Sequence, residues 1–200
     1  MSKYLKSPEV ENTLHQPGLE RDACGVGLVA HIKGEASHRV LRLGLDSVNN
    51  VTHRGAVNAD GKTGDGAGVT TNLPYRILLP EAEKLGMALN NPSDLAVGVF
   101  FLPAQRTDDQ TKCRVIAEGV LRNRGIGIIG WRDVPTDPSA LGQQAIDTMP
   151  VIQQLLLQRP DGMDDDTFER QLYLSRREIE DKASDEKVYE FYIPSLSHRL

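Results

Sequence analysis

Residues 95–102 read LAVGVFFL, an apolar run of strand length that is followed directly by Pro103. Proline has no backbone N–H to donate, so it closes a strand of this kind. The run predicts a buried strand around which the rest of the chain packs. No apolar run approaches the roughly 18 residues that a membrane-spanning helix requires. The sequence therefore predicts a globular domain that does not enter a membrane.

Helices and further strands surround this run. Apolar residues at helical spacing predict an amphipathic helix over residues 37–51 with Ser37 as its N-cap. Two further helices are expected to begin at capping boxes, S/T/D-x-x-E/Q patterns. Strands are expected at 26–33, 69–73, 127–131 and 188–193, the capping boxes lie at 107–110 and 166–169, and 151–157 fits a strand or a helix. Because the elements mix without regular βαβ alternation, the predicted class is α+β.

The helix that begins near Thr107 has a clear apolar face and a clear end. Gly125 stands where a C-terminal glycine cap belongs. The residues expected on the apolar face are Cys113, Ile116, Ala117, Val120 and Leu121. Cys113 is therefore expected to be a core residue rather than a reactive thiol.

Composition excludes several functional classes. The 200 residues carry a net charge of −5 and no run of lysine or arginine, so a nucleic-acid partner is not expected. Two cysteines are too few for a disulfide framework, which favours a reduced, cytoplasmic protein. The five histidines show no metal-binding spacing, so no metal site is expected.

Two glycine motifs resemble nucleotide-binding signatures but lack the required context. Residues 25–30 fit G-x-G-x-x-A, yet a polar segment precedes them where a strand is required. Residues 61–63 read GKT, but the nearest upstream glycine, Gly55, is one residue too distant for a phosphate-binding loop. Neither motif therefore predicts a nucleotide site.

Residues 1–23 are not a targeting segment. They contain no apolar run of a secretory signal, and their acidic residues argue against an organelle transit peptide. Prolines and glycine make the segment loop-like. Two interpretations remain at this point: a disordered tail, or a leader that is removed immediately before Cys24.

Removal of that leader would make Cys24 an N-terminal nucleophile. An α-amine has a pKa of roughly 7.7–8.0, so it accepts a proton near neutral pH and activates the thiol on the same residue. Gly25 allows the backbone close to a bound substrate. Residue spacing alone leaves a buried structural cysteine as the alternative.

Four segments in order resemble one family. Residues 20–38 read ERDACGVGLVAHIKGEASH and residues 53–68 read HRGAVNADGKTGDGAG. Together with GWRDVP at 130–135 and YIPSLS at 192–197, they resemble the amino-terminal class II glutamine amidotransferase domain of bacterial glutamate synthase large subunits. The resemblance extends over nearly the whole chain from about Leu19.

The resemblance implies an N-terminal nucleophile hydrolase with an αββα four-layer sandwich. It divides the chain into a removable leader, residues 1–23, and the amino-terminal part of the amidotransferase domain, residues 24–200. Cleavage falls between Ala23 and Cys24, and Cys24 forms a γ-glutamyl thioester with glutamine. Arg54 holds the substrate α-carboxylate, because a guanidinium group pairs bidentately with carboxylates. Asp60 and Asp65 lie in the following glycine-rich loop, where shaping the loop is a more natural role than direct contact with glutamine.

The resemblance also implies partners outside this segment. The released ammonia would be used with 2-oxoglutarate to make glutamate, with FMN, an iron–sulfur cluster and a small electron-delivering subunit. None of these cofactors is expected to bind residues 1–200. Two alternatives remain open, namely a non-catalytic fragment or pseudoenzyme that serves as an interaction module, and a class II amidotransferase with another acceptor.

One element of the family pattern is missing. The family's oxyanion hole contains an Asn-Gly pair, and none of the eight asparagines in this chain precedes a glycine. We therefore expect residues 24–200 to be the first half of the domain, inactive in isolation. Such a half-domain is also expected to be poorly soluble, because strand edges and apolar surface remain uncovered.

Overall fold

The computed structural model describes residues 25–51, 55, 57–64, 66–87, 89 and 91–199. The chain forms two compact units, Met1–Ala56 and Val57–Leu200, and each is described by itself. None of the described helices is long and apolar enough to cross a membrane.

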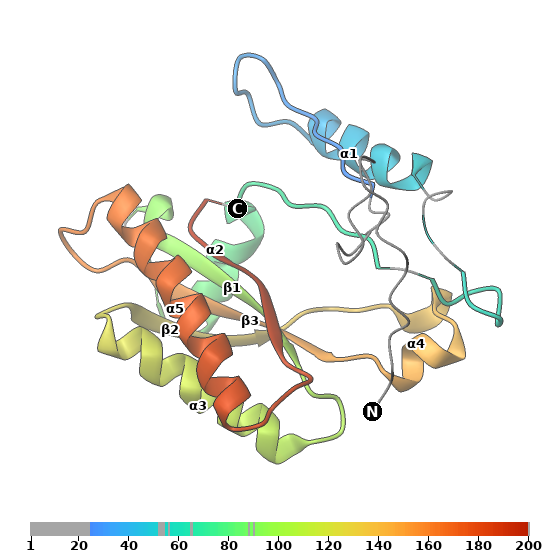
Figure 1. The fold of residues 1–200 in the computed structure, drawn as a ribbon. Coiled ribbons are helices and arrows are strands. Elements are labelled where there is room, and N and C mark those ends of the chain that lie inside the picture. Colours follow the sequence, from blue (N-terminus) through green and yellow to red (C-terminus); the bar gives the residue numbers. More distant parts are fainter. Residues whose placement is uncertain are drawn as a thin grey trace, which may run out of the picture. The chain divides into compact units, whose positions relative to one another are not determined.

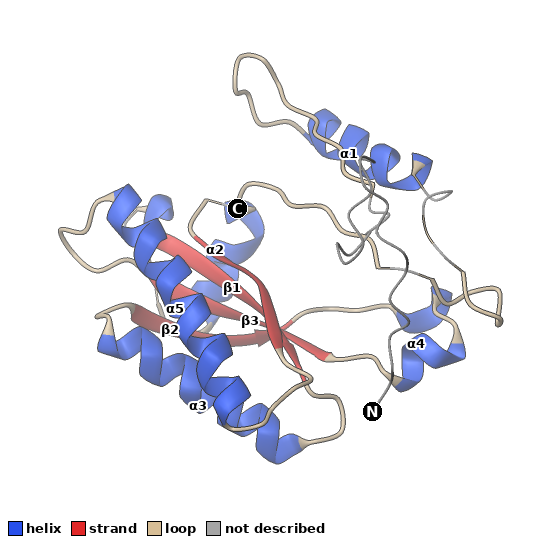
Figure 2. Ribbon diagram, viewed as in Figure 1, coloured by secondary structure: helices blue, strands red, loops and turns tan. Residues whose placement is uncertain are grey.

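The larger unit is built on one antiparallel sheet (Figures 1 and 2). Its strands are β1 (Leu95–Leu102), β2 (Gly127–Asp133), β3 (Val151–Gln158) and β4 (Tyr192–Ser197), in the order β2-β3-β1-β4. β1 pairs with β3 along its whole length, from Leu95 opposite Gln158 to Leu102 opposite Val151. The predicted α+β class and the strand at 95–102 are confirmed, and the ambiguous segment 151–157 is a strand.

Two helices cover one face of this sheet. They are α3 (Thr107–Asn123) and α5 (Asp165–Asp185), which also pack against each other (Figure 1). Alternate residues of the central strands, such as Phe100 and Leu155, point into this core. The Phe100 ring lies edge-on to Trp131, with 4.8 Å between ring centroids. The helices contribute Cys113, Ala117, Val120, Leu121, Phe168, Leu172, Ile179 and Ala183. The predicted apolar face of α3 is confirmed.

The residues that the structure describes cover the opposite face only in part. Helix α2 (Tyr75–Lys84) packs Leu78 and Ala82 on Leu95, Val97 and Leu156 at one end of the sheet. At the other end Val99, Phe101 and Ile152 are half-buried and Tyr192 is exposed, stacked on Phe101 at 4.7 Å. Sequence reasoning missed α2, which contains Pro80 in its interior.

The link from β2 to β3 leaves the sheet and returns to it. It contains a short 3₁₀ turn (Pro138–Ala140) and α4 (Gln143–Asp147), which lies apart from the sheet at the end of two extended arms (Figure 1). The arms are joined at their base, where the amide of Val134 donates to the carbonyl of Ile152 at 3.1 Å. A second 3₁₀ turn (Pro92–Asp94) precedes β1.

Helix α3 ends as predicted but begins differently. Gly125 has φ +74°, and the amide of Ile126 donates to the carbonyl of Leu121 at 3.1 Å, which is a Schellman cap. At the other end the N-cap is Arg106, so the predicted capping box at Thr107 is wrong. The reason is that Gln110 does not reach back to the cap, because its amide nitrogen donates to the carbonyl of Pro103 at 2.8 Å.

Helix α5 also begins before its predicted cap. Asp164 is the N-cap, and its carboxylate accepts a hydrogen bond from the amide of Thr167 at 2.9 Å. The capping box at 166–169 is wrong because Glu169 faces β4 instead. It accepts hydrogen bonds from the Ser197 hydroxyl at 2.7 Å and the His198 amide at 3.1 Å.

The strand predicted at 188–193 is displaced toward the C-terminus. Lys187 has φ 60°, and the amide of Val188 donates to the carbonyl of Ala183 at 2.9 Å. Val188 therefore completes the end of α5 and is not available to a sheet, so β4 begins only at Tyr192. The strand predicted at 69–73 is also wrong, since these residues form no strand.

The smaller unit contains α1 (His38–Asn50). The Ser37 hydroxyl accepts a hydrogen bond from the amide of Val40 at 3.4 Å, so the predicted helix and its cap are confirmed. The strand predicted at 26–33 is wrong. Among the described residues this segment pairs with no strand, and Val26, Leu28 and Ile32 are more than 90% exposed. A strand needs a neighbour for its backbone groups, which apolar pattern alone does not provide.

Replacing Gly98 in β1 by alanine is expected to destabilise the larger unit by about 1–3 kcal/mol, because overpacking strains a dense core. The added Cβ would lie 2.5 Å from the Phe100 ring and 2.8 Å from Leu196. Urea denaturation of the purified chain measures the effect. Gly119→Ala is the matched control, because Gly119 is an exposed position in α3 with open space around it. Equal midpoints for the two variants would contradict this packing.

Replacing Asp164 by alanine is expected to lower the urea midpoint at pH 7, because it removes the α5 cap. The backbone and side-chain hydrogen bonds from Thr167 hold the pKa of Asp164 below its usual value. The cap therefore contributes stability above the unfolded-state pKa, and this contribution is lost as the pH falls through the lower folded-state pKa. Asp164→Ser should preserve the midpoint. Asp166→Ala, which removes a surface pair with Arg199, should cost less than Asp164→Ala; the reverse order would refute this assignment.

Candidate functional site

Most of the residues that the sequence predicts for the site lie outside the described part of the chain. Cys24, Ala23, Arg54 and Asp65 belong to this group, as does the whole segment 1–23. Asp60 is described.

Within the smaller unit, the residue after Cys24 lies against the end of α1. A Cβ atom placed on Gly25 would be 3.3 Å from the Cβ of Val51, the C-cap residue of α1. Gly27 lies beside the same helix, because a Cβ atom placed on it would be 3.9 Å from the Cβ of Ser47. The segment that begins at Gly25 therefore starts beside Val51 and runs back along the C-terminal half of α1.

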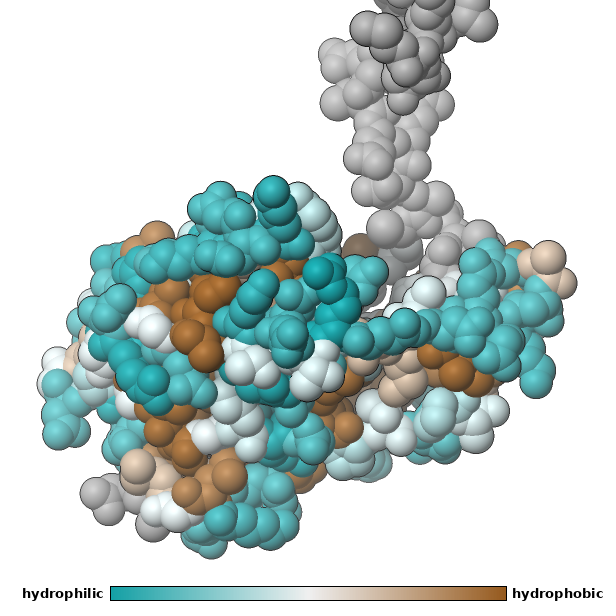
Figure 3. All heavy atoms as spheres, turned by 90° about the horizontal axis from the view of Figure 1, so that it is seen from below, coloured by the Kyte–Doolittle hydropathy of each residue, from teal (hydrophilic) through white to brown (hydrophobic). Residues whose placement is uncertain are grey.

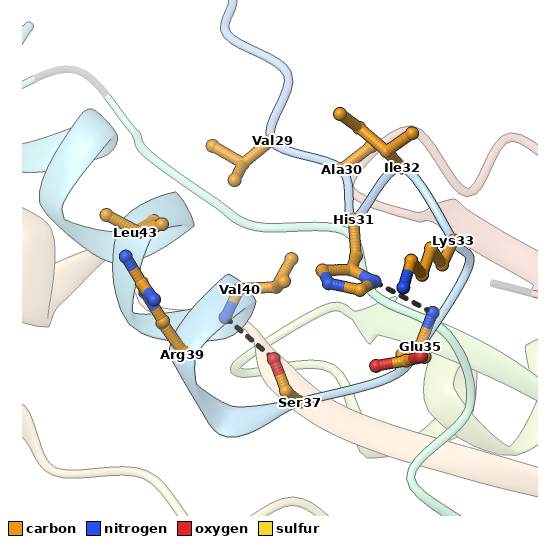
Figure 4. Close-up of a pocket in the computed structure, with 10 residues that line it drawn as sticks. All are labelled: Val29, Ala30, His31, Ile32, Lys33, Glu35, Ser37, Arg39, Val40 and Leu43. Atoms are coloured by element: carbon orange, nitrogen blue, oxygen red, sulfur yellow. Dashed lines mark hydrogen bonds between the residues drawn. The ribbon is translucent and has the colours of Figure 1, made fainter.

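A pocket of about 600 Å³ lies at the other end of α1 (Figure 4). The 29–33 segment forms one wall, and Val40 and Leu43 of α1 form part of the other. The His31 ring accepts a hydrogen bond from the amide of Glu35 at 3.2 Å, which closes the turn between the two walls. Asp60, the one described residue among those predicted for the site, does not line this pocket.

Within the larger unit, Asp60 closes a tight loop. One carboxylate oxygen accepts hydrogen bonds from the amides of Lys62 at 3.0 Å and Thr63 at 2.7 Å. The other accepts from the Thr63 hydroxyl at 2.5 Å. These bonds, the Thr63 hydroxyl first, hold the pKa of Asp60 below its usual value. Both oxygens of Asp60 are therefore engaged by the loop itself.

The backbone of this loop is equally constrained. Val57 and Gly64 form an antiparallel bridge, and the amide of Asn58 donates to the carbonyl of Thr63 at 2.7 Å. Gly61 has φ +68°, a conformation that favours glycine. We call residues 57–64 the Asp60 loop. It begins three residues after Arg54 in the sequence and ends one residue before Asp65.

The Asp60 loop lies against the start of α4. The Asn58 side-chain amide donates to the Gln144 side-chain oxygen at 2.9 Å. Gly142, the N-cap of α4, is close enough to the loop that an added Cβ would collide with Asp60 and Thr63. Sequence reasoning missed Gly142 and Gln144, because no motif joins them to a loop about 80 residues earlier.

The second cysteine is a core residue. Cys113 lies on the buried face of α3 and is fully buried in the core. Burial, with a smaller contribution from the charge of Asp109, raises the pKa of its thiol to about 11. A protonated, inaccessible thiol is a poor nucleophile, which confirms the prediction for Cys113.

Comparison with known proteins identifies the family. Residues 24–200 match the family described as Glutamine amidotransferases class-II. The glutamate synthase [NADPH] large chain of Azospirillum brasilense is 40% identical over 185 residues, which cover 92% of this chain and 12% of that protein. The glutamate synthase [NADH] of Schizosaccharomyces pombe is 40% identical over 193 residues, 93% of this chain and 9% of that protein.

A third relative is named for a different electron donor, ferredoxin. The ferredoxin-dependent glutamate synthase 2 of Synechocystis is 36% identical over 188 residues, 93% of this chain and 12% of that protein. The chain thus spans between 9% and 12% of the length of these three relatives. These matches confirm the resemblance inferred from the four sequence segments. Because the family match covers 24–200, this chain belongs to the class-II glutamine amidotransferases.

Proposed function

We propose that this chain is the glutamine-hydrolysing part of a glutamate synthase, with Cys24 as its N-terminal nucleophile. The match to the amidotransferase family begins at residue 24, the residue that removal of the leader 1–23 would make the N-terminus. The relatives are named as glutamate synthases with NADPH, NADH or ferredoxin. The electron donor named for these relatives varies while the similarity persists, so the proposal concerns glutamine hydrolysis rather than the donor.

The observation that carries the proposal is the contact between Gly25 and Val51. Cys24 is the immediate neighbour of Gly25, and Arg54 follows Val51 by three residues. Only a short stretch of chain therefore separates each of the two proposed residues from this contact. This contact supports a site in which the proposed nucleophile and the proposed carboxylate-binding residue serve one substrate.

The chemistry follows from a thiol and a primary amine on one residue. The α-amine of Cys24 takes the thiol proton, and the sulfur attacks the side-chain amide carbon of glutamine. The C–N bond breaks, the nitrogen leaves as ammonia with that proton, and a γ-glutamyl thioester remains on Cys24. Water then attacks the thioester carbon, which releases glutamate and restores the thiol.

The other proposed residues bind the substrate or shape the loop near it. Arg54 pairs with the α-carboxylate of glutamine through its guanidinium fork. Asp60 maintains the loop that follows Arg54, a role supported by its hydrogen bonds to Lys62 and Thr63. Asp65, the residue that follows this loop in the sequence, is assigned the same supporting role.

We further propose that the fold is an αββα sandwich of which residues 24–200 form the first half. The incomplete cover on the α2 side of the sheet supports this, because Phe101, Ile152 and Tyr192 are left for a second layer to cover. Helix α1 has an apolar face and no buried residue. Hydrophobic residues also reach the surface in patches among hydrophilic ones (Figure 3). A second sheet packed on the α2 side would bury Phe101, Ile152 and Tyr192.

The remaining assignments concern the rest of the polypeptide. In this proposal the ammonia is used there with 2-oxoglutarate to form glutamate, in the cytoplasm. FMN and an iron–sulfur cluster supply the electron transfer in that part, and a small subunit delivers the electrons. The described residues of this chain contain no group of three or more side chains suited to hold a metal ion.

Replacing Cys24 by alanine in the full-length polypeptide is expected to reduce ammonia release from glutamine by at least about a thousandfold, because the nucleophile is lost. Cys113→Ala is the matched control and should retain activity, since that thiol is buried. Intact mass measurement of the wild type should give a chain that starts at Cys24. A mature protein that retains Met1 or Ser2 and releases no ammonia would instead support a non-catalytic interaction module.

Replacing Arg54 by glutamine is expected to raise the KM for glutamine about tenfold to a hundredfold, because a charge-assisted hydrogen bond to the substrate is lost. Steady-state ammonia release as a function of glutamine concentration measures this. Arg42→Gln is the control, because Arg42 is exposed on α1. An unchanged KM in Arg54→Gln would remove Arg54 from the proposed site.

A further inference from the structure

The outer face of α5 carries exposed apolar side chains among charged ones. Tyr173 is 59% exposed and Leu174 is 40% exposed, whereas the buried residues of α5 lie on its opposite face. Arg170, Arg177 and Asp181 are also exposed. A helix turns by about 100° per residue, which places these three charged residues within about 40° of one another. The five residues therefore form one stripe, which we call the outer stripe.

The outer stripe belongs to the layer of helices that covers the sheet on the side opposite α2 (Figure 1). The second sheet proposed above packs on the α2 side, so it would leave the outer stripe exposed. Tyrosine and arginine are enriched at the contact surfaces of proteins. The composition of the stripe is therefore typical of an interface.

Two charges of the outer stripe have no partner among the described residues. Arg177 pairs with Glu180 at 3.0 Å, and other charged residues of α5 are paired within the same molecule. Arg170 and Asp181 form no ion pair or hydrogen bond with any residue that the structure describes. They carry opposite charges and lie 11 residues apart, about three helical turns.

A second copy of the helix would supply both missing partners. In an antiparallel pair related by a two-fold axis, residue i of one copy lies opposite residue j of the other, and j lies opposite i. An axis between positions 175 and 176 places Arg170 opposite Asp181 of the second copy, twice by symmetry. The same axis brings the two Leu174 side chains together. It also places Tyr173 near Arg177 of the second copy, and a guanidinium group is attracted to an aromatic face.

The side chains of the stripe favour this register over its neighbours. Moving the axis by two residues toward the N-terminus places Arg170 opposite Arg177, and like charges at an interface oppose association. Moving it by two residues toward the C-terminus places Leu174 opposite Asp181, which takes a carboxylate out of water without a partner. Only the axis between positions 175 and 176 pairs both free charges and keeps the leucines in contact.

We propose that the outer stripe of α5 is an antiparallel interface between two copies of this chain, in which Arg170 of each copy pairs with Asp181 of the other. The inference does not depend on the proposed function. Exposed ion pairs contribute little free energy, and one pair of helices buries less than the roughly 1,200 Å² of a stable interface. We therefore expect the association to be weak and reversible.

Disulfide trapping of the purified chain detects a weak dimer. The two Leu174 positions would be offset by about 4.5 Å along the helices, a separation that a disulfide can bridge. Leu174→Cys, in a Cys24→Ser background, is expected to form a covalent dimer under mild oxidation at least about tenfold faster than Gly119→Cys in the same background. Gly119 is the matched control because it is exposed on α3 with open space around it. Equal rates for the two variants overturn the inference.

Charge reversal tests the register. Arg170→Asp and Asp181→Arg, each combined with Leu174→Cys, should slow trapping about tenfold, because each places like charges together twice in the dimer. The double reversal makes the charges opposite again and should restore the rate to within about twofold. Arg42→Asp, at an exposed position of α1, controls for the change in net charge and should leave the rate unchanged.

The variants also discriminate between occupants of the stripe. A double reversal that traps as slowly as the single reversals overturns the Arg170–Asp181 pairing. An effect of Arg170→Asp without an effect of Asp181→Arg overturns it as well, and indicates a different acidic partner for Arg170. Urea midpoints check that each variant folds. If a reversal unfolds the chain, Arg170→Gln and Asp181→Asn replace the reversals and should each slow trapping about threefold, since the attraction is lost without repulsion; unchanged trapping in both overturns the inference.

Discussion

The pairing of β1 with β3 is the constraint on which the larger unit depends. All eight residues of β1 are in register with β3, so successive side chains are assigned alternately to the two faces of the sheet. Phe100 and Leu155 face the helices α3 and α5, whereas Val97 and Leu156 face α2. A shift of one residue would exchange these faces and place the core residues of each side on the other. Helices α3 and α5 on one face and α2 on the other can bury these residues only because this register holds.

The same register extends its support to the Asp60 loop. The arms that carry α4 leave the end of β2 and enter the start of β3, and they are joined at Val134 and Ile152. The start of α4 in turn contacts the Asp60 loop through Gly142 and Gln144. A loop that sequence reasoning treats as a local glycine-rich turn is thus supported by the sheet. The sheet thus holds in place a loop that has little regular structure of its own.

Sequence reasoning succeeded where the determining contacts lie within a few residues. Ser37 caps α1 and Gly125 ends α3. The run at 95–102 also forms β1 with the predicted bounds, because its apolar pattern is unbroken, although its partner strand β3 is distant in the sequence. Sequence reasoning failed where a side chain had a distant partner. Glu169 completes no capping box because it accepts hydrogen bonds from Ser197, the last residue of β4, and from His198, the residue after it. The apolar segment 26–33 has a strand-like pattern, yet in the described residues no neighbouring strand satisfies its backbone.

By itself the sequence determined the family, the α+β class and the residues proposed for the chemistry, Cys24 and Arg54. These depend on residue type and on order along the chain, both of which a sequence contains. Only the tertiary structure decided that Gly25 lies against Val51 and that the Asp60 loop rests on Gly142. The physical reason is that a close approach between two segments distant in the sequence leaves no pattern in the sequence of either segment. A glycine that is needed because another segment lies within van der Waals distance looks, in the sequence, like any other glycine.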